Sequence, residues 1–269
     1  MIDKINAMYE KKETNRVSRT FWTLLVVALL LWSATTVGSV NVTKNGLEIA
    51  SNIIRGIFTP STELLFNWSE QSVGYLLLET MAIAFLGTLV GAVFSFPLSF
   101  LASSKVVPFP VVIVTRLVVI LIRTIPAFVY GLMFIRVTGP GPFAGLMTLS
   151  VTSIGMLTKL FSETIDDIDT SIIEALDAMG CNTFAKIRHG ILPQLWSSLL
   201  STLIFRFDMN LRDATTLGLV GAGGIGAPLI FAMSSYRWSE VGALLLGLIV
   251  LILIVEFSSS YIRKKLAHG

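Results

Sequence analysis

Residues that build disulfides, metal sites and catalytic centres are scarce in this sequence. Cysteine occurs once, as Cys181, and histidine twice, as His189 and His268. A single cysteine excludes an internal disulfide, and these three dispersed side chains cannot form a Cys/His metal cluster. The chain also lacks the G-x-x-x-x-G-K-[ST] phosphate-binding loop of ATPases. We therefore expect no catalytic residues, no metal and no cofactor bound by this chain.

Charged residues are few as well, at 14% of the 269 residues, whereas hydrophobic residues make up 54%. A soluble domain does not need this much apolar surface. A membrane-spanning helix needs about 17–25 mainly apolar residues. Six stretches meet that requirement, near residues 20–40, 75–101, 111–136, 143–161, 195–216 and 240–260. The sequence therefore predicts an all-α polytopic membrane protein with six transmembrane helices.

Basic residues are distributed unevenly around these spans. If both termini face the cytoplasm, twelve basic residues fall on the cytoplasmic side and four fall outside, namely Lys44, Arg55, Arg136 and Arg237. Cytoplasmic segments of membrane proteins carry an excess of Lys and Arg. The bias therefore predicts that both the N and C termini are cytoplasmic.

Residues 1–73 are expected to contain a cytoplasmic tail, the first span and an outer amphipathic segment. The apolar run from Phe21 to Trp32 follows basic residues and precedes small ones, so a cleaved signal peptide is an alternative to a retained span. Beyond it, Ile53, Ile54 and Ile57 follow helical spacing, which predicts an amphipathic helix. This helix either lies on the outer membrane surface or packs against the outer end of the bundle.

The core, residues 74–262, is expected to hold five spans and one long cytoplasmic loop, residues 162–194. A short helix is predicted to begin near Ser171, which has the spacing of a capping box with Glu174, and to end at Gly180. Ala175, Leu176 and Met179 give this helix a compact apolar face. Taken alone, the loop could be a mere connection, and Glu174 could be a capping acid without another role.

A second short helix is predicted from about Thr183 to His189, and it leads to Leu192 and Pro193. The proline suits the first turn of the fifth span. The spacing of Glu174-Ala175, Gly180 and Leu192-Pro193 resembles the signature of binding-protein-dependent ABC importer permeases. In that signature Glu-Ala-Ala, three residues, Gly, nine residues, Ile, one residue and Leu-Pro mark the coupling loop.

Two positions depart from the signature, because Leu176 stands for the second Ala and Gly190 stands where Ile is usual. The resemblance implies that the loop sits in a cleft of a cytoplasmic ATPase subunit. The predicted ATPase-coupling residues are Glu174, Ala175, Leu176, Met179, Gly180, Leu192 and Pro193.

A run of glycines follows the fifth span, at Gly221, Gly223, Gly224 and Gly226. It formally matches the G-x-G-x-x-G dinucleotide fingerprint, but it follows a membrane span rather than a strand and lies outside any βαβ unit. Glycines allow close approach of backbones. We therefore expect a tightly packed or re-entrant segment at the outer mouth.

The segment from Arg206 to Gly226 resembles the corresponding part of phosphonate-importer permeases, as do residues 139–145 and 157–163. The resemblance covers roughly residues 75–262. Permeases for phosphite, phosphate and methionine share parts of it. The implied solute is therefore a phosphonate or a related phosphorus oxyanion, with another small solute such as methionine as the alternative.

Four arginines fall inside the predicted spans, namely Arg116, Arg123, Arg206 and Arg212. An arginine near a helix centre costs about 2.5–3.5 kcal/mol on the insertion scale, so none is expected to face lipid. Arg116 lies near the cytoplasmic end, where its side chain can extend to the interface. Arg123 and Arg206 are predicted close to mid-depth.

On the fifth span, Arg206, Asn210 and Asp213 share one helical face, whereas Asp208 and Arg212 share roughly the opposite one. These groups could be internal ion pairs that tie the bundle together. However, four arginines against two aspartates leave an excess of positive charge that suits an anionic solute. The predicted substrate pathway comprises Arg123, Arg206, Asn210, Arg212 and Asp213, with Arg123 and Arg206 foremost.

The family resemblance implies a type I ABC importer permease fold in the bacterial inner membrane and transport by alternating access. It implies two ABC ATPase subunits, which bind ATP and Mg, a periplasmic or lipid-anchored substrate-binding protein, and a second permease, either an identical copy or a related chain. Membrane lipid is the remaining partner, and no nucleic acid is expected. A stand-alone channel or an intramembrane enzyme is the competing class, but the spans contain no His or Cys for an active site.

Overall fold

The computed structural model describes residues 16–36, 44–66, 69 and 71–268, and the chain divides into two units, residues 1–50 and 51–269. The first unit contains α2 (Arg16–Thr36), whose residues 18–36 form an apolar helix long enough to cross a membrane. The helix α3 (Lys44–Phe58) begins in the first unit and ends in the second.

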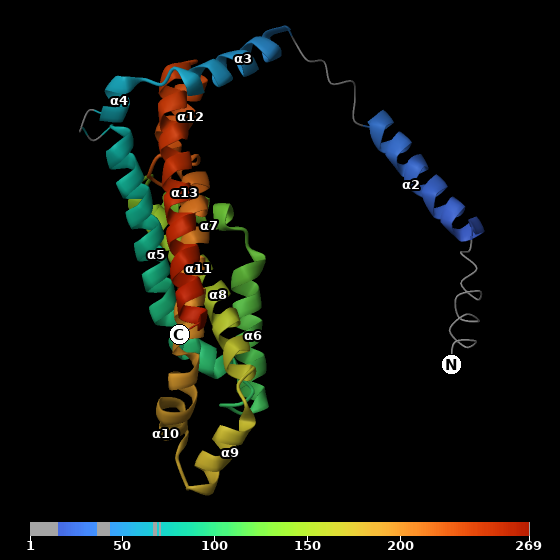
Figure 1. The fold of residues 1–269 in the computed structure, drawn as a ribbon, viewed down its shortest axis with the longest axis vertical. Helices are drawn as coiled ribbons and strands as arrows, with labels where there is room; N and C mark the ends of the chain where they lie inside the picture. Colours follow the sequence, from blue (N-terminus) through green and yellow to red (C-terminus); the bar gives the residue numbers. More distant parts are fainter. Residues whose placement is uncertain (1–15, 37–43, 67–68, 70, 269) are drawn as a thin grey trace. The chain divides into compact units, whose positions relative to one another are not determined.

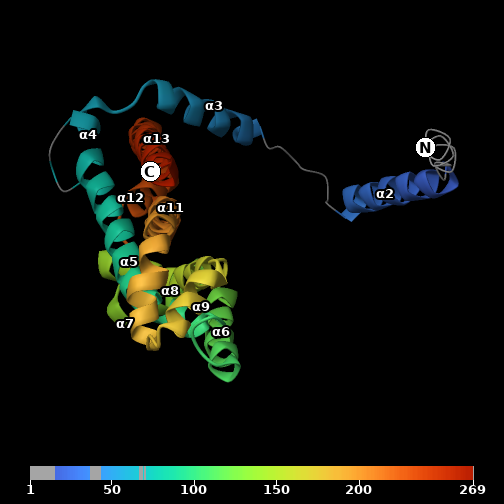
Figure 2. The same cartoon turned by 60° about the horizontal axis from the view of Figure 1, so that its bottom comes forward.

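The second unit is a helical bundle built around α5 (Val73–Ala102) and α8 (Pro142–Asp166), which pack along much of their length. Glycines make this packing close, since a Cβ atom on Gly87 or Gly91 would lie 2.6 and 2.4 Å from Leu149 and Ser153. Two further long helices, α11 (Leu192–Gly218) and α13 (Trp238–His268), complete the bundle (Figures 1 and 2).

The stretch expected to be the third span is not one straight helix. It forms α6 (Phe109–Thr124) and α7 (Ala127–Thr138), which meet at an angle of 82°. Pro126 lacks a backbone N–H and disfavours the helical conformation at Ile125, which is extended with φ −84° and ψ 123°. Arg123 therefore lies in the last turn of α6, not in the middle of a continuous span.

Among the described residues, four helices are long and apolar enough to span a membrane, or five spans if the bent α6–α7 pair counts as one. The fifth expected span, α11, is 27 residues long, which corresponds to about 40 Å. It is not among the apolar helices, because its charged residues cluster between Arg206 and Asp213. The chain is thus an all-helical membrane protein, and six spans remain a prediction.

The short helices lie at the two ends of this bundle. The connecting helices α4 (Thr62–Phe66) and α12 (Gly226–Ser234) lie at one end, and α9 (Thr170–Ala178) and α10 (Thr183–Ala185) lie at the opposite end (Figure 1). The segment 162–194 is therefore at the same end as the last turns of α13, where Ser197 donates a hydrogen bond to the carbonyl of Leu266.

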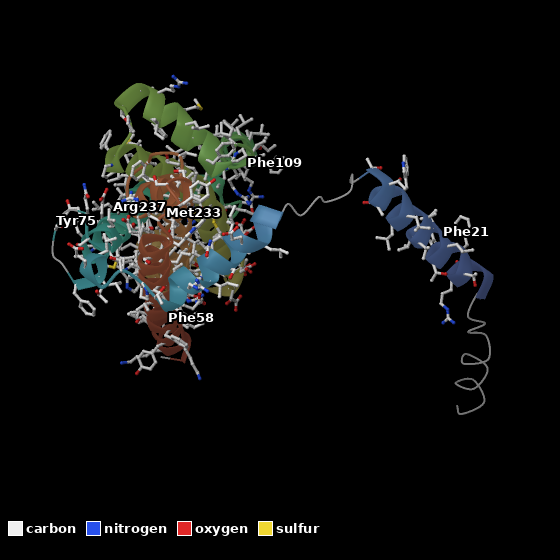
Figure 3. The ribbon with its side chains drawn as sticks, turned by 90° about the horizontal axis from the view of Figure 1, so that it is seen from above. Phe21, Phe58, Tyr75, Phe109, Met233 and Arg237 are labelled. Carbon is white, nitrogen blue, oxygen red and sulfur yellow. The ribbon has the colours of Figure 1, made fainter. Side chains whose placement is uncertain are left out.

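The C-terminal half of α3 packs against the first turns of α13. A Cβ atom on Gly56 would lie 2.3 Å from the carbonyl oxygen of Trp238, and one on Gly242 would overlap the carbonyl of Gly56. Ile54 and Phe58 nevertheless remain 58% and 81% exposed, and Phe58 is labelled in Figure 3. This half of the helix thus packs on the bundle through one face and leaves an apolar face uncovered.

Candidate functional site

A cavity of about 220 Å³ lies where the α6–α7 bend meets α8 and α11. Its charged lining consists of Arg123 from α6 and of Arg206 and Asp213 from α11. Neutral residues complete the wall, namely Ile122, Ile125, Pro126, Ala127, Thr152 and Met156. The fold thus brings three of the five predicted pathway residues to one cavity. Two arginines against one aspartate leave its lining with a net positive charge.

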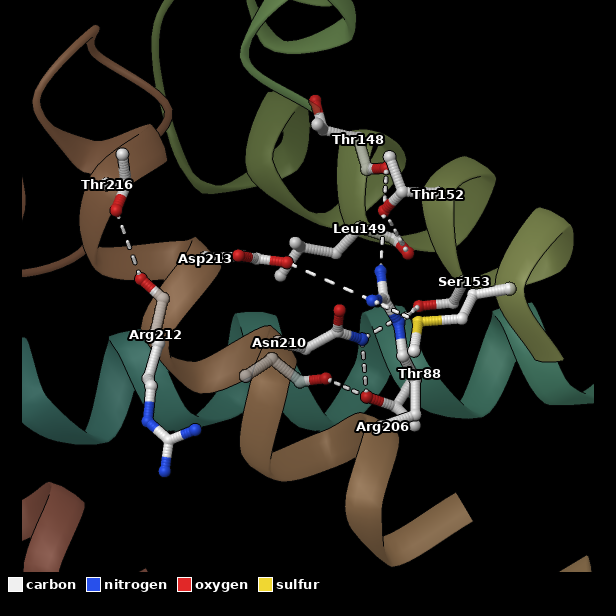
Figure 4. Close-up of polar contacts among 12 residues, drawn as sticks. Thr88, Thr148, Leu149, Thr152, Ser153, Arg206, Asn210, Arg212, Asp213 and Thr216 are labelled. Carbon is white, nitrogen blue, oxygen red and sulfur yellow. Dashed lines mark hydrogen bonds and ion pairs between the residues drawn. The ribbon is translucent and has the colours of Figure 1, made fainter. Parts of the chain in front are cut away.

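Arg206 is held rigidly at this cavity, and its residue is only 4% exposed. Its Nε donates to Ser153 Oγ at 3.0 Å, and one Nη donates to Thr152 Oγ1 at 3.0 Å (Figure 4). The other Nη contacts Met156 Sδ at 3.1 Å and lies 4.0 Å from Asp213 Oδ2. Three residues of α8 therefore fix the guanidinium group, and its second Nη is directed toward the aspartate.

Asn210 lies beside Arg206 but does not line the cavity. Its Nδ2 donates to Thr88 Oγ1 at 2.7 Å and to Ser153 Oγ at 2.8 Å, so it links α5, α8 and α11. Its Oδ1 is buried without a hydrogen-bond partner among the described residues. The geometry makes Asn210 a support for Ser153 and, through it, for Arg206.

Arg123 differs from Arg206 in being exposed and unpaired. Among the residues the structure describes, no hydrogen bond or ion pair involves its side chain. Gly155 of α8 makes room for it, because a Cβ atom there would lie 2.9 Å from Arg123 Cγ. Its charge is therefore available to a solute in the cavity.

Arg212 is placed elsewhere, on the side of α11 that faces α13. Its guanidinium group lies 3.1 Å from Asp208 Oδ2 and also pairs with Glu256 of α13. The expected i,i+4 pairing of Asp208 with Arg212 is therefore present, and the structure does not bring Arg212 to the cavity. The sequence pattern did not reveal Glu256 as the interhelical partner.

A second cavity, of about 330 Å³, shares Arg123 with the first and extends toward the end of the bundle that carries α9. Its charged groups are mostly paired: Arg116 with Asp166 at 2.7 Å, and Lys159 with Glu163 at 3.1 Å. Asp166 also accepts hydrogen bonds from Ser103 and Ser104. Arg116 is exposed, with 49% of its side chain accessible, as expected for a residue near the end of its span, and it also ties α6 to the ends of α5 and α8.

The coupling segment forms a helical hairpin. Its first helix is capped by Asp169, whose carboxylate accepts the backbone N–H of Ser171 at 3.0 Å. The expected capping box of Ser171 and Glu174 is therefore wrong, because Ser171 already lies inside the helix. This bond lowers the pKa of Asp169 below its ordinary value of 3.8. Gly180 ends the helix as expected, with φ +74°.

The second part of the hairpin is continuous with α11. The predicted helix from Thr183 to His189 is present, but it consists of the single turn α10 and a π-helical segment, Lys186–Ile191, which runs directly into α11. Pro193 lies in the first turn of α11 as expected. A π-helical segment within a helix is often found at functional sites.

The two departures from the coupling-loop signature contact each other. A Cβ atom on Gly190 would lie 2.4 Å from Leu176 Cδ1, so the large residue on α9 fills the space left by the glycine. An ion pair between Lys186 and Asp177 joins the same two segments. Met179 and Phe184 at the tip of the hairpin are each 69% exposed. The sequence pattern had singled out Met179 but not Phe184.

The glycine run after α11 packs backbone against backbone. Gly221, Gly223 and Gly224 have positive φ angles, and a Cβ atom on Gly226 would lie 2.3 Å from the carbonyl oxygen of Thr215. The N–H of Gly224 donates to Glu79 Oε1 at 3.1 Å. No other residue fits such a turn without strain. Its location at the outer mouth stays a prediction.

Comparison with known proteins assigns this architecture. A family profile described as "Binding-protein-dependent transport system inner membrane component" matches residues 95–268. The chain belongs to this family. It is therefore a multi-pass inner-membrane permease of an ABC transporter, a transport subunit rather than an enzyme. A permease of this kind works with an ATPase and a binding protein.

Individual relatives of this chain include permeases of phosphorus-oxyanion transporters. The chain is 31% identical to the phosphite transport system permease protein PtxC of Stutzerimonas stutzeri, over 89% of this chain and 85% of that protein. It is 34% identical to the phosphate-import permease protein PhnE of Mycolicibacterium smegmatis, over 71% of this chain but only 36% of that protein. The solved MetNI methionine ABC transporter in inward-facing conformations contains a similar fold, with TM-score 0.60, 20% identity and coverage of 81% and 98%.

Proposed function

We propose that this permease translocates a phosphorus oxyanion, such as a phosphonate, phosphite or phosphate, through a pathway that includes the Arg123–Arg206 cavity. The carrying observation is that two arginines from different helices line one cavity with a single aspartate. In a site of low dielectric, such a net positive charge attracts a small anion. The sequence similarity to phosphite and phosphate permeases supports the same class of solute.

The hairpin of α9 and α10 is the proposed contact with the ATPase. Its tip presents two large apolar side chains, Met179 and Phe184, and Glu174 of α9 is exposed as well. An exposed apolar tip is typical of a surface that is covered by a partner. Because the π-helical segment continues into α11, movement of the hairpin acts directly on the helix that carries Arg206.

The proposed assembly contains two permease copies, two ATPase subunits and an extracytoplasmic binding protein, with both permease termini in the cytoplasm. ATP-driven closure of the ATPase dimer would draw the two hairpins together and open the pathway outward. This is alternating access, and it requires no covalent chemistry on the solute.

The substrate class is tested by uptake into proteoliposomes that hold the permease, its ATPase and its binding protein. The panel is radiolabelled phosphate, phosphite, methylphosphonate and methionine, each with and without internal ATP. We expect ATP-dependent uptake of at least one phosphorus oxyanion and none of methionine. ATP-dependent methionine uptake without oxyanion uptake would refute the proposal, and solute flux that ignores ATP would indicate a channel.

A further inference from the structure

Asp213 is the unusual member of the proposed anion cavity, because a carboxylate repels an anion. Its side chain is 40% exposed, whereas that of Arg206 is 5% exposed. The 4.0 Å between Arg206 Nη1 and Asp213 Oδ2 is too long for a hydrogen bond. Within the described part of the chain, no group donates a hydrogen bond to Asp213. The carboxylate therefore faces the cavity with its acceptor positions free.

If Arg206 and Asp213 formed a structural ion pair, their charged atoms would be closer together. Where this chain uses such pairs, the contacts are shorter: Arg116 to Asp166 is 2.7 Å and Arg212 to Asp208 is 3.1 Å. Arg206 instead donates its 3.0 Å hydrogen bonds to Ser153 and Thr152. The arginine is held in place without the aspartate.

The cavity thus offers two kinds of partner to a solute. Arg206 and Arg123 supply hydrogen-bond donors, and Asp213 supplies only acceptors. An oxyanion that keeps a hydroxyl group can satisfy both, since its P–O⁻ oxygens accept from arginine and its P–OH donates to the carboxylate. A fully deprotonated tetrahedral anion such as sulfate has only acceptor oxygens. It cannot donate a hydrogen bond to Asp213, so two negatively charged acceptors face each other.

Building on the proposed function, we propose that Asp213 makes the cavity selective for oxyanions that carry a proton, so that it takes phosphorus oxyanions with a P–OH group and rejects sulfate. The nearby charged groups are compatible with this role. Arg206 and Arg123 line the same cavity, while Arg212 is engaged with Asp208 and Glu256 on the other side of α11. Once a bound anion covers Asp213 and removes it from water, an unmatched carboxylate lowers the affinity by roughly ten- to a hundredfold.

The test uses the detergent-purified permease with its ATPase, and it measures the melting temperature with inorganic phosphate or sulfate at equal ionic strength. A ligand that binds the folded state raises the melting temperature. Both anions also stabilise proteins non-specifically and can occupy the ATPase. The Arg206→Gln protein measured in the same buffers supplies that background, which is subtracted.

After subtraction, we expect phosphate to stabilise the wild-type protein and to show at least a tenfold lower half-saturating concentration than sulfate. Asp213→Asn, whose amide can donate as well as accept, should bring the two anions to within about threefold. Asp213→Glu keeps the acceptor and should keep the preference for phosphate. Glu256→Gln is the matched control outside the cavity and should behave as wild type.

The experiment distinguishes failure of the Asp213 role from failure of the anion site itself. Equal stabilisation of the wild-type protein by phosphate and sulfate, both lost in Arg206→Gln, would leave an anion site and overturn only the role of Asp213. An unchanged preference for phosphate in Asp213→Asn would do the same. If neither anion stabilises the wild-type protein beyond the Arg206→Gln background, the cavity is no anion site and the proposed function fails as well.

Discussion

The contact between Leu176 and Gly190 predicts that these two positions are energetically coupled. Replacing Gly190 with isoleucine, the residue usual at this point of the coupling-loop signature, should overpack the hairpin because Leu176 Cδ1 already lies 2.4 Å from the position of the new Cβ. Combining Gly190→Ile with Leu176→Ala should relieve the overlap. The swap moves the bulk from α9 to the π-helical segment and keeps the contact filled.

The magnitude follows from two opposing effects. Overpacking costs about 1–3 kcal/mol, whereas replacing glycine with isoleucine in a helix gains roughly 0.5 kcal/mol. Gly190→Ile alone should therefore destabilise the hairpin by roughly 0.5–2.5 kcal/mol. Because neighbours in contact are not additive, the double variant should be more stable than the sum of the single effects by at least 1 kcal/mol.

The assay is limited trypsin cleavage after Lys186 and Arg188, which lie in the π-helical segment. When opening and closing are faster than cleavage, the rate follows the population of the opened hairpin. We expect Gly190→Ile to speed cleavage roughly two- to sixtyfold, since each 1.4 kcal/mol is a factor of ten. His189→Ile, at the exposed neighbouring position, is the matched control and should change the rate little.

Equal acceleration of cleavage by Gly190→Ile in the wild-type and Leu176→Ala backgrounds would contradict this coupling. That result would mean that the two side chains do not meet in the membrane-bound protein. Co-purification of the ATPase with each variant checks that the hairpin remains able to bind its proposed partner.

Three further predictions concern the coupling hairpin and the α6–α7 bend. Gly180→Val should weaken the ATPase contact or uncouple hydrolysis from uptake, because a left-handed φ of +74° costs a side-chain-bearing residue about 1–2 kcal/mol. Gly180→Asn should be tolerated better, and equal ATPase co-purification of the two variants would contradict this. Pro126→Ala should let α6 and α7 straighten and lower oxyanion uptake, whereas unchanged uptake would show that the bend is not needed. The lowered pKa of Asp169 means that its cap stabilises α9 above pH 3.8 and is lost as the pH falls through the lowered value, so amide exchange in α9 should accelerate there but not in Asp169→Asn.

The sequence predicted much of this architecture because its strongest signals are local. Long apolar runs predict helices, and the spacing of Glu174, Gly180 and Pro193 predicts the hairpin. Helical periodicity also places Arg206 and Asp213 on one face of α11, where the structure finds them 4.0 Å apart. These inferences need only the chain's own spacing.

The predictions that were wrong or incomplete concern features set by contacts with other helices or by competing local backbone interactions. The apolar run from 111 to 136 predicts one continuous span, although Pro126 within it indicates a possible break in the helix. The capping box failed because Asp169, two residues earlier, already accepts the N–H of Ser171, which a capping box would direct to Glu174. Glu256 could not be paired with Arg212 from spacing alone, since the two lie on different helices.

The hydrogen-bonding partners of Arg206 were also not predicted, yet a signal for them exists. Thr148 and Thr152 recur at i,i+4 on α8, and Ser153 follows directly, within a span that also carries Ser150 and Thr158. Small polar residues at such spacing in a membrane helix often bond across to another helix. A search for them would have proposed α8 as the partner of Arg206.

Arg206 is proposed to bind an anion in the cavity rather than to hold the bundle together. ATP-dependent uptake of the transported oxyanion should be measured for Arg206→Gln and for Arg212→Gln, together with purified yield and ATPase co-purification. We expect Arg206→Gln to fold, to bind the ATPase and to lose at least tenfold in uptake, whereas Arg212→Gln should retain uptake in the protein that folds. Normal transport by Arg206→Gln would contradict a role in anion binding, and so would recovery of both yield and uptake when Asp213→Asn is added to it, because Arg206 would then be only the partner of Asp213.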